Sequence, residues 1–222
     1  MGTLYLVRHG QASFGADDYD VLSPLGQRQS IRLGEYFSAK DVQFEAALTG
    51  TLNRQVQTFA GICKGLGAPL SSVQWPGLNE YDAGAMIAAS HPGRLEKPDT
   101  PELYKHHFRL LKAGLAQWIA GAASPAGMPS HIKFVADVNS ALAHACRHYT
   151  GDVLLVSSGG PIAMAVGHLL GASAAATIDM NMGIRNTAVT EFGFNARGCR
   201  LLTYNTLPHL DAPEYASWVT YA

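Results

Sequence analysis

The sequence has few cysteines and no long hydrophobic run. Its three cysteines, Cys63, Cys146 and Cys199, are an odd number, lie far apart and form no C-x-x-C pair. This pattern argues against a disulfide framework and against a zinc ribbon, and it is typical of a protein from a reducing compartment. No apolar run reaches transmembrane length, and the pattern of a secretory leader is not found. We therefore expect a cytoplasmic protein with no membrane partner.

An excess of charge of one sign is also lacking. The formal net charge is -1, the isoelectric point is about 6.7, and only 15% of the residues are charged. Without an overall basic field, nucleic acid is not an expected partner, and any anion site must be local. A hydrophobic content of 47% over 222 residues fits a globular chain with a sizeable core. We expect a single domain over residues 1–222.

The first apolar stretch, Leu4–Val7, runs straight into Arg8, His9 and Gly10. A short apolar run of strand-forming residues predicts a buried strand, and a glycine allows a sharp turn at its end. In open α/β sheets, ligands bind at this carboxyl edge. Arginine presents a fork of donors to phosphate oxygens, and histidine is a nucleophile or proton carrier near neutral pH. The stretch therefore predicts an anion site, with a structural histidine beside a surface arginine as the alternative.

Strand and helix patterns alternate along the rest of the chain. Further strands are predicted at Phe44–Leu48, Val153–Val156, Thr187–Phe194 and Leu201–Tyr204. Helices are predicted at Leu25–Phe37 behind a Ser23-Pro24 cap, at Leu52–Leu66 ended by Gly67, at Tyr104–Trp118, at Ile132–Tyr149, and from Pro161 onward. This alternation favours an α/β fold, a three-layer α/β/α sandwich with a mainly parallel sheet. The tail after Pro208 receives no assignment.

A segment of weak periodicity lies in the middle of the chain. Trp75–Pro101 is rich in glycine, proline and alanine and is predicted to be a long loop. Together with the helix and connector that follow, it forms a predicted insertion at about 76–130 that borders the site. Long loops in compact domains are usually functional. His91, Arg94 and Lys97 could bind a second acidic group of a substrate, or they could simply be solvated.

Five segments form a series of motifs along the chain: Leu4–Gly10, Leu22–Gln29, Thr51–Thr58, Leu78–Gly84 and Val153–Gly160. In this order they resemble the motifs of the histidine phosphatase (phosphoglycerate mutase-like) superfamily. Leu4–Gly10 is similar to its Arg-His-Gly strand end, and Leu22–Gln29 to its L-[ST]-x-x-G-x-x-Q segment. Thr51–Thr58 resembles its L-x-R-x-x-Q-T helix start, and Leu78–Gly84 its L-x-E-x-x-x-G acid motif. Val153–Gly160 stands where the family has a strand ending in S-H-G-G. The resemblance implies a phosphoglycerate mutase-like fold.

The resemblance also implies roles for single residues. His9 would be the nucleophile that takes the phosphoryl group, and Arg8 and Arg54 would clamp its oxygens. Phosphoryl transfer needs in-line positioning and neutralisation of charge, which two guanidinium groups supply. Glu80 would protonate the leaving oxygen, with Asp82 as the alternative acid. The expected phosphate-binding residues are Arg8, Gly10, Gln11, Arg54, Ser158 and Gly159.

Two positions depart from the family pattern. Ser158 stands where the family usually has its second active-site histidine, and a serine hydroxyl can donate a hydrogen bond but brings no positive charge. The backbone N-H groups at the start of the following helix could compensate. Phe14-Gly15 stands where mutases of the family carry an asparagine that contacts phosphate. These departures count against a mutase more than against a phosphatase.

The sequence analysis therefore predicts a phosphomonoester hydrolase acting through phospho-His9 on a small phosphorylated substrate or a phosphoprotein. A phosphoglycerate mutase and a non-catalytic phospho-ligand binding protein with a degenerate site are the alternatives. No cofactor is implied. His144 and His148 have the i, i+4 spacing of zinc ligands but no third ligand nearby in sequence, so no metal site is expected. His106 and His107 border the pocket or form a solvated helix face. The sequence leaves open whether the chain forms a homo-oligomer.

Overall fold

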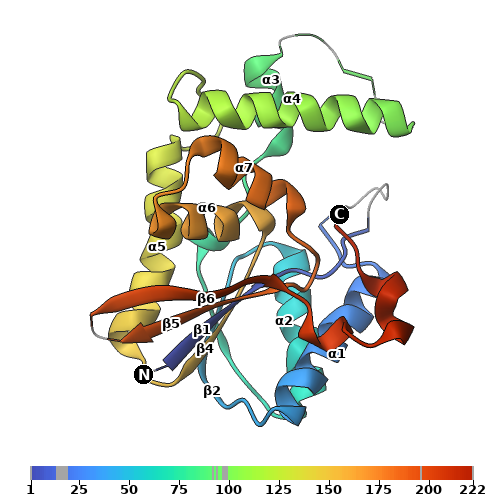
Figure 1. Cartoon of the computed structure of the whole chain (residues 1–222), viewed down its shortest axis with the longest axis vertical. Coiled ribbons are helices and arrows are strands. Elements are labelled where there is room, and N and C mark those ends of the chain that lie inside the picture. The colour runs from blue at the N-terminus through green and yellow to red at the C-terminus, as the bar shows by residue number, and fades with distance from the viewer. Residues whose placement is uncertain are drawn as a thin grey trace.

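The chain forms a six-stranded sheet between two groups of helices (Figure 1). The computed structural model describes residues 2–13, 20–91, 93, 95–96, 100–195 and 197–221. Within them the strand order is β3-β2-β4-β1-β5-β6. The strands are β1 (Gly2–Arg8), β2 (Phe44–Thr49), β3 (Ser72–Gln74), β4 (Asp152–Ser157), β5 (Val189–Asn195) and β6 (Gly198–Thr206).

Parallel pairing dominates the sheet. β4 runs parallel to β1 and β2, and β2 runs parallel to β3, whereas β5 is antiparallel to β1 and β6. The predicted mainly parallel sheet is confirmed. Arg8 pairs with Ser157 at the ends of β1 and β4, and the N-H of His9 donates to the carbonyl of Ser157 at 2.9 Å. The two predicted site segments therefore leave the sheet together at its carboxyl edge.

Helices cover both faces of this sheet. They are α1 (Pro24–Ala39), α2 (Asn53–Leu66), α3 (Ala83–Ser90), α4 (Pro101–Ile119), α5 (His131–His148), α6 (Gly159–Leu170) and α7 (Ala174–Gly183). Short 3-10 helices lie at Pro76–Leu78, Pro208–Leu210 and Pro213–Trp218. Among the described residues, no helix combines the length and the apolar character needed to cross a membrane.

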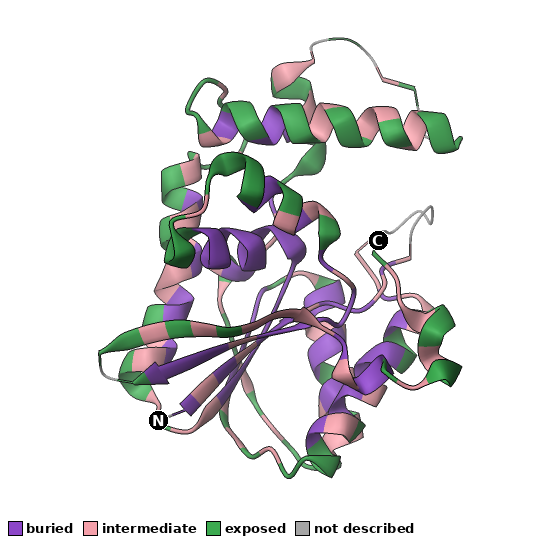
Figure 2. Cartoon of the chain, viewed as in Figure 1, coloured by how far each residue is buried: buried purple, intermediate pink, exposed green. Residues whose placement is uncertain are grey.

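Two hydrophobic cores show how the three layers form. Val7 of β1 packs with Leu33 and Phe37 of α1 on one face. Leu6 packs with Ile162 of α6 on the other face. Neighbouring residues of a strand point to opposite faces, so one apolar strand contributes to both cores. Figure 2 shows the central strands and the inner sides of the helices as buried. Each fully buried side chain of this size contributes about 1.5–3 kcal/mol.

The predicted boundaries of α1 and α2 are confirmed to within two residues. The side chain of Ser23 accepts a hydrogen bond from the N-H of Gly26 at 3.0 Å, and Pro24 is the first residue of α1. α2 ends at Gly67, which has a φ of 68°. This left-handed conformation is accessible to glycine without strain. At the other end of α2, Arg54 lies in the first turn.

The central segment differs from its prediction as a long loop. Trp75–Pro101 includes a 3-10 helix and α3, and the edge strand β3 precedes it. α3 packs against α4, where a Cβ added to Gly114 would lie only 2.4 Å from the carbonyl oxygen of Met86. α7 was not predicted either. Both missed helices consist mainly of alanine and other small or apolar residues, so they lack a 3.6-residue polar period. The predictions for Arg94, Lys97, Phe14 and Gly15 lie outside the described residues.

Candidate active site

His9 occupies the turn that follows β1. Its side chain is buried, and its Nδ1 lies 2.7 Å from the carbonyl oxygen of Gly10. A carbonyl can only accept a hydrogen bond, so Nδ1 carries the proton and Nε2 keeps its lone pair. Nε2 in turn accepts a hydrogen bond from Nε of Arg54 at 3.2 Å. The imidazole therefore directs its nucleophilic nitrogen at a cationic side chain.

The charge state of His9 follows from its surroundings. Burial, followed by the nearby Arg8 and Arg54, lowers the pKa of His9 well below its usual value. The ring is therefore neutral at pH 7, which is the form with a lone pair available for attack. Both predicted clamp arginines act on the same imidazole.

Gly10 and Gln11 make structural contacts. The N-H of Gly10 donates to Oγ1 of Thr58 at 2.9 Å, and a Cβ at this position would lie 2.5 Å from the carbonyl oxygen of Gly26. Glycine is therefore required where the turn passes α1. The N-H of Gln11 donates to Oε1 of Gln29 at 2.8 Å, and its own side chain accepts from the hydroxyl of Ser23. These bonds fix the turn that carries His9.

Arg54 has an acidic partner that the sequence motifs did not indicate. Its Nη1 lies 2.6 Å from Oδ1 of Asp20, and Oδ2 of Asp20 accepts from the N-H of Asn53 at 2.8 Å. The carboxylate thus bridges the guanidinium group and the start of α2, where the helix dipole favours an anion. Asp20 fixes the orientation of Arg54 and partly neutralises its positive charge.

Arg8 is held by backbone carbonyls from the far end of the chain. Its Nη1 donates to the carbonyl oxygens of Ile184 and Tyr221, both at 2.5 Å. The C-terminal segment is itself bound, because Thr220 pairs with Asn186 through backbone and side-chain hydrogen bonds. The unassigned tail therefore reaches the predicted site. Such a contact across 213 positions leaves no local sequence signal.

Glu80 lies in the loop before α3 and faces the start of α6. Both of its carboxylate oxygens lie 3.1 Å from the N-H of Gly160, which donates to them. A Cβ at Gly160 would be 2.1 Å from Oε1 of Glu80, so only glycine allows this approach. Burial raises the pKa of Glu80, while the bond from Gly160 and the charges of Arg8 and Arg54 act in the opposite direction. A raised pKa favours the protonated carboxyl group, which is the form that can donate a proton.

Asp82, the alternative acid, has a different environment. Its side chain is exposed and accepts a hydrogen bond from the N-H of Ala85 at 2.9 Å. This is the geometry of a helix N-cap, and it starts α3. The two carboxylates are therefore distinguished by their contacts, since Glu80 contacts α6 and Asp82 caps its own helix.

Ser158 precedes α6 and is fully buried. Its hydroxyl oxygen accepts a hydrogen bond from Nε2 of Gln55 at 2.9 Å, and the same Nε2 donates to the carbonyl of Leu78. Gln55, next to Arg54 in α2, is also fully buried, and the motif comparison did not single it out. The amide of Gln55 therefore fills the space beside the Ser158 hydroxyl.

Gly159 brings the first turn of α6 against Arg8. A Cβ there would lie 2.8 Å from Cγ2 of Ile184, 3.1 Å from Oδ1 of Asn181 and 3.7 Å from Nε of Arg8. The absence of a side chain lets the helix start approach the guanidinium group closely. The Gly160 N-H already donates to Glu80, the Ile162 N-H donates to the carbonyl of Ser158, and Pro161 has none, so it is the dipole of α6 that favours an anion at this place.

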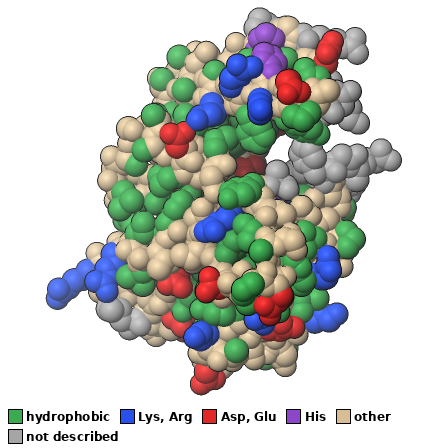
Figure 3. Space-filling view, turned by 45° about the vertical axis from the view of Figure 1, so that its right-hand side comes forward, with side chains coloured by type: hydrophobic (Ala, Val, Ile, Leu, Met, Phe, Trp, Pro, Cys, Tyr) green, Lys and Arg blue, Asp and Glu red, His purple; other side chains and the backbone are tan. Residues whose placement is uncertain are grey.

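Other predicted candidates lie elsewhere. Figure 3 shows histidine, lysine and arginine side chains gathered at the top of the molecule, where Figure 1 places α4, and a hollow below this edge. The ring of His107 contacts that of His106, and its Nε2 lies 3.0 Å from the carbonyl oxygen of Glu96. In the described residues, no group of three or more histidine, cysteine, aspartate or glutamate side chains could hold a metal ion.

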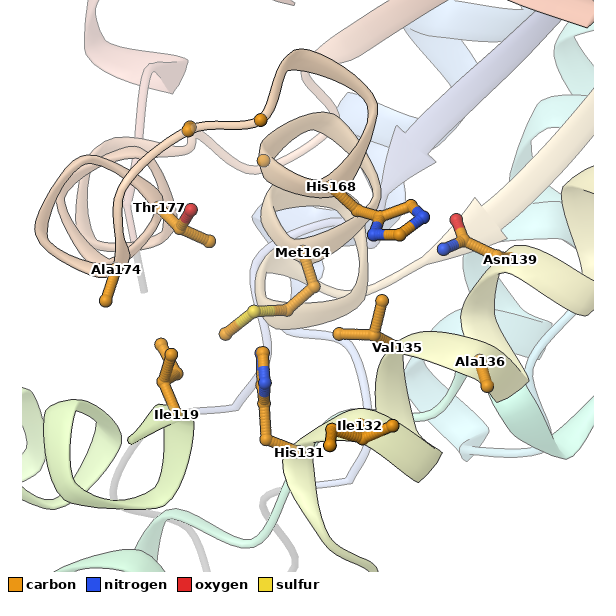
Figure 4. A pocket seen from close by; sticks show the side chains of 13 residues that line it. Ile119, His131, Ile132, Val135, Ala136, Asn139, Met164, His168, Ala174 and Thr177 are labelled. Carbon is orange, nitrogen blue, oxygen red and sulfur yellow. The ribbon is translucent and has the colours of Figure 1, made fainter. Parts of the chain in front are cut away.

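A pocket of about 660 Å³ between α5, α6 and α7 is lined by none of the predicted site residues. Figure 4 shows Met164, Val135 and Ile119 pointing into it, with His131 and His168 at its sides. Ile132, which was part of the helix pattern that predicted α5, also lines this pocket and is 81% exposed. The pocket is mainly apolar and offers no arginine or lysine to an anion, so it does not supply the chemistry expected at the sheet edge.

Comparisons with known proteins bear on the family and the fold of the chain. A family model described as histidine phosphatase superfamily (branch 1) matches residues 4–207. No curated protein matches the chain. The structure resembles phosphoserine phosphatase from Entamoeba histolytica, solved with 3-phosphoglyceric acid, at 19% identity and a TM-score of 0.66, covering 95% of this chain and 100% of that chain.

Two further solved structures have the same fold. A mycobacterial glucosyl-3-phosphoglycerate phosphatase is 22% identical with a TM-score of 0.65, covering 93% of this chain and 99% of that one. A phosphoglycerate mutase from Bacillus anthracis is 18% identical with a TM-score of 0.64, and 94% of each chain is covered. The three-layer α/β fold predicted from the sequence is thus confirmed as phosphoglycerate mutase-like.

Proposed function

Because the chain belongs to the histidine phosphatase superfamily, we propose that it is a phosphomonoester hydrolase that acts through a phosphohistidine on His9. The observation that carries this proposal is the state of His9, a neutral imidazole whose Nδ1-H is bound by Gly10 and whose Nε2 lies beside Arg54. A lone pair held next to a guanidinium group is suited to attack a phosphorus atom whose oxygens that group binds.

The reaction then proceeds in two transfers. In the first, Nε2 of His9 forms a bond to phosphorus, the ester P-O bond breaks, and Glu80 gives its proton to the leaving oxygen. In the second, water attacks the phosphohistidine, gives a proton to the Glu80 carboxylate, and inorganic phosphate leaves. Arg8, Arg54 and the positive end of the α6 dipole neutralise the charge on the phosphoryl oxygens in both steps.

The surroundings of each residue support these roles. The raised pKa of Glu80 favours the protonated form that the first step needs, whereas the exposed Asp82 already caps α3. Ser158 offers a neutral hydroxyl group beside the site in place of an imidazolium, and the amide of Gln55 holds that hydroxyl in position. The substrate class we propose is a small phosphorylated metabolite or a phosphoprotein, as the phosphorylated ligand of the Entamoeba phosphatase suggests.

A hydrolysis assay against phosphoserine, 3-phosphoglycerate, sugar phosphates and a phosphohistidine peptide tests the proposal. We expect release of inorganic phosphate from at least one ester, and an acid-labile phosphoenzyme that maps to His9. Movement of phosphate within 3-phosphoglycerate without its release would instead identify a mutase. Binding of phosphate with no turnover of any ester would identify a phospho-ligand binding protein.

A further inference from the structure

Two cysteines that are distant in sequence meet at the end of the sheet away from the candidate active site. Cys146 lies near the end of α5, and Cys199 is the second residue of β6; Figure 1 shows these two element ends side by side at the lower left. Their sulfur atoms are 2.8 Å apart, and both are free thiols. This separation is within hydrogen-bonding distance and only slightly more than a disulfide bond of about 2.05 Å.

The fold holds both thiols in place. Cys199 pairs with Phe194 across the β5–β6 hairpin, directly after Gly198, which begins β6 with a φ of 139°. Both cysteines are partly buried and pack against the larger hydrophobic core. The thiols are therefore carried by a helix end and a strand start, and not by a mobile loop that could bring them together by chance.

The pair is polarised and open to small molecules. The hydrogen bond from Cys146 lowers the pKa of the Cys199 thiol, while the same bond and burial raise the pKa of the Cys146 thiol. Both cysteines line a pocket of about 340 Å³, and Arg147 and Arg197 line it too. A thiolate that is accessible to solvent is the reactive form of cysteine.

We propose that Cys146 and Cys199 are a modification site at which a hydroperoxide forms a reversible disulfide. The Cys199 thiolate attacks the terminal peroxide oxygen, the O-O bond breaks, and a sulfenic acid and one water or alcohol result. Cys146 then attacks the Cys199 sulfur, the S-S bond forms, and a second water leaves. Two thiols are oxidised and one hydroperoxide is reduced, so atoms and electrons balance.

This site differs in kind from the disulfide framework that the cysteine count argued against. A framework needs several permanent bridges, whereas one pair that oxidises and is reduced again is compatible with a reducing compartment, where such disulfides are usually transient. Cys63 lies outside the pair and serves as the internal reference, since it packs against the smaller hydrophobic core and its sulfur donates to the carbonyl oxygen of Leu70 at 3.9 Å.

Mass spectrometry of the full chain tests the proposal directly. The protein is treated with one equivalent of hydrogen peroxide, labelled with iodoacetamide and digested without reduction. We expect three labels on the reduced protein, one label on the oxidised protein, at Cys63, and a peptide pair linked through Cys146 and Cys199. Dithiothreitol should restore three labels. The disulfide should also raise Tm by roughly 4–15 °C.

Variants separate this outcome from non-specific oxidation. Cys63→Ser should still form the disulfide, whereas Cys146→Ser should accumulate a sulfenic acid on Cys199 that dimedone traps. Three labels after peroxide treatment, a linked peptide containing Cys63, or direct conversion of Cys199 to a sulfinic acid in the unmodified sequence would overturn the proposal. The peptide map of the unmodified protein decides the question even if a variant does not fold.

Discussion

Two buried histidines contact the same loop in this protein, and their surroundings give them different chemistry. His9 is 3% exposed and His209 is 1% exposed. The N-H of Thr187 donates to the carbonyl of His9, and the hydroxyl of Thr187 lies 2.9 Å from Nε2 of His209. Burial lowers the pKa of both imidazoles, that of His209 to about 3. Burial alone therefore does not identify the functional histidine.

The two rings differ in which nitrogen carries the proton. His9 donates from Nδ1 to Gly10 and keeps the Nε2 lone pair next to Arg54. The Thr187 hydroxyl donates to the carbonyl of Asn186, so it accepts from His209, which must carry its proton on Nε2. Nδ1 of His209 is buried and has no hydrogen-bond partner within the described part of the chain. The unprotonated nitrogen of His9, the nucleophile that we propose, therefore faces a cation, whereas that of His209 does not.

The largest predicted effect is the loss of activity when His9 is replaced, with replacement of His209 as the control. His9→Ala should lower kcat/KM by at least about a thousandfold while phosphate binding stays detectable, because the arginines carry the charge and the imidazole forms the bond. His209→Phe should keep activity within about tenfold. Kinetics on one good ester and calorimetric titration with phosphate measure both. Full activity of His9→Ala would contradict the assignment of the nucleophile.

A second prediction compares Glu80 with Asp82, two carboxylates whose contacts differ as those of the two histidines do. Glu80→Gln should lower kcat by about 10²–10³, within the range for a general acid. Asp82→Asn is the matched control, and it should leave kcat nearly unchanged because that side chain caps α3.

The pH profile sharpens this second test. In the proposed mechanism, the first transfer uses neutral His9, whose pKa is lowered, and protonated Glu80, whose pKa is raised. The rate should therefore fall in acid as His9 gains a proton, and fall toward alkaline pH as Glu80 loses one. Glu80→Gln should flatten the alkaline side only. An alkaline limb that disappears in Asp82→Asn would assign the acid to Asp82 instead.

Local signals in the sequence predicted much of the fold and several of the residues that the structure brings together at the candidate site. Leu4–Val7 is apolar because β1 is buried on both faces, and the residues that follow a strand reach the ligand edge whatever the details of packing. Ser23 and Gly67 mark helix ends through their own backbone chemistry. Arg54 reaches His9 because its place in the first turn of α2 determines its direction.

The parts that were not predicted depend on contacts between distant segments. Asp20 and Gln55 acquire their roles only when the turn after β1, α2 and α6 meet, and no short motif encodes such a meeting. The carbonyl of Tyr221 binds Arg8 through its backbone, which any residue could supply. α3 and α7 were missed because small apolar residues give no periodic pattern.

The third prediction concerns Ser158, where the sequence comparison expects a histidine. The structure places the Gln55 amide against the serine hydroxyl with both residues fully buried, so an imidazole would have to displace that amide. Ser158→His alone should therefore cost about 1–3 kcal/mol of stability through overpacking and raise kcat/KM by less than about tenfold. Denaturant unfolding and steady-state kinetics measure the two effects.

A double variant shows whether a histidine at position 158 fails to raise the rate because Gln55 occupies its space or because the site already works with serine. Ser158→His with Gln55→Ala removes the amide that fills the space, and the Gln55→Ala single variant is its control. If the serine site is already adapted, the double variant should recover stability without a large gain in rate. A rise of a hundredfold or more would correspond to a restored charged donor and would favour the binding-protein alternative for the natural sequence.

The smallest predicted effect is the acid sensitivity that His209 gives to the fold. Its folded pKa of about 3 lies below the unfolded value near 6.5, so between these values the unfolded chain binds one more proton. The stability contribution of neutral His209 is therefore fully present above pH 6.5 and is lost as the pH falls toward 3. Between pH 7.5 and 5.5 the loss should be about 1–1.5 kcal/mol. In urea unfolding at the two pH values, the unfolding free energy of His209→Phe should fall by that much less than that of the unmodified protein. Equal losses in the two proteins would show that the ring is not held neutral.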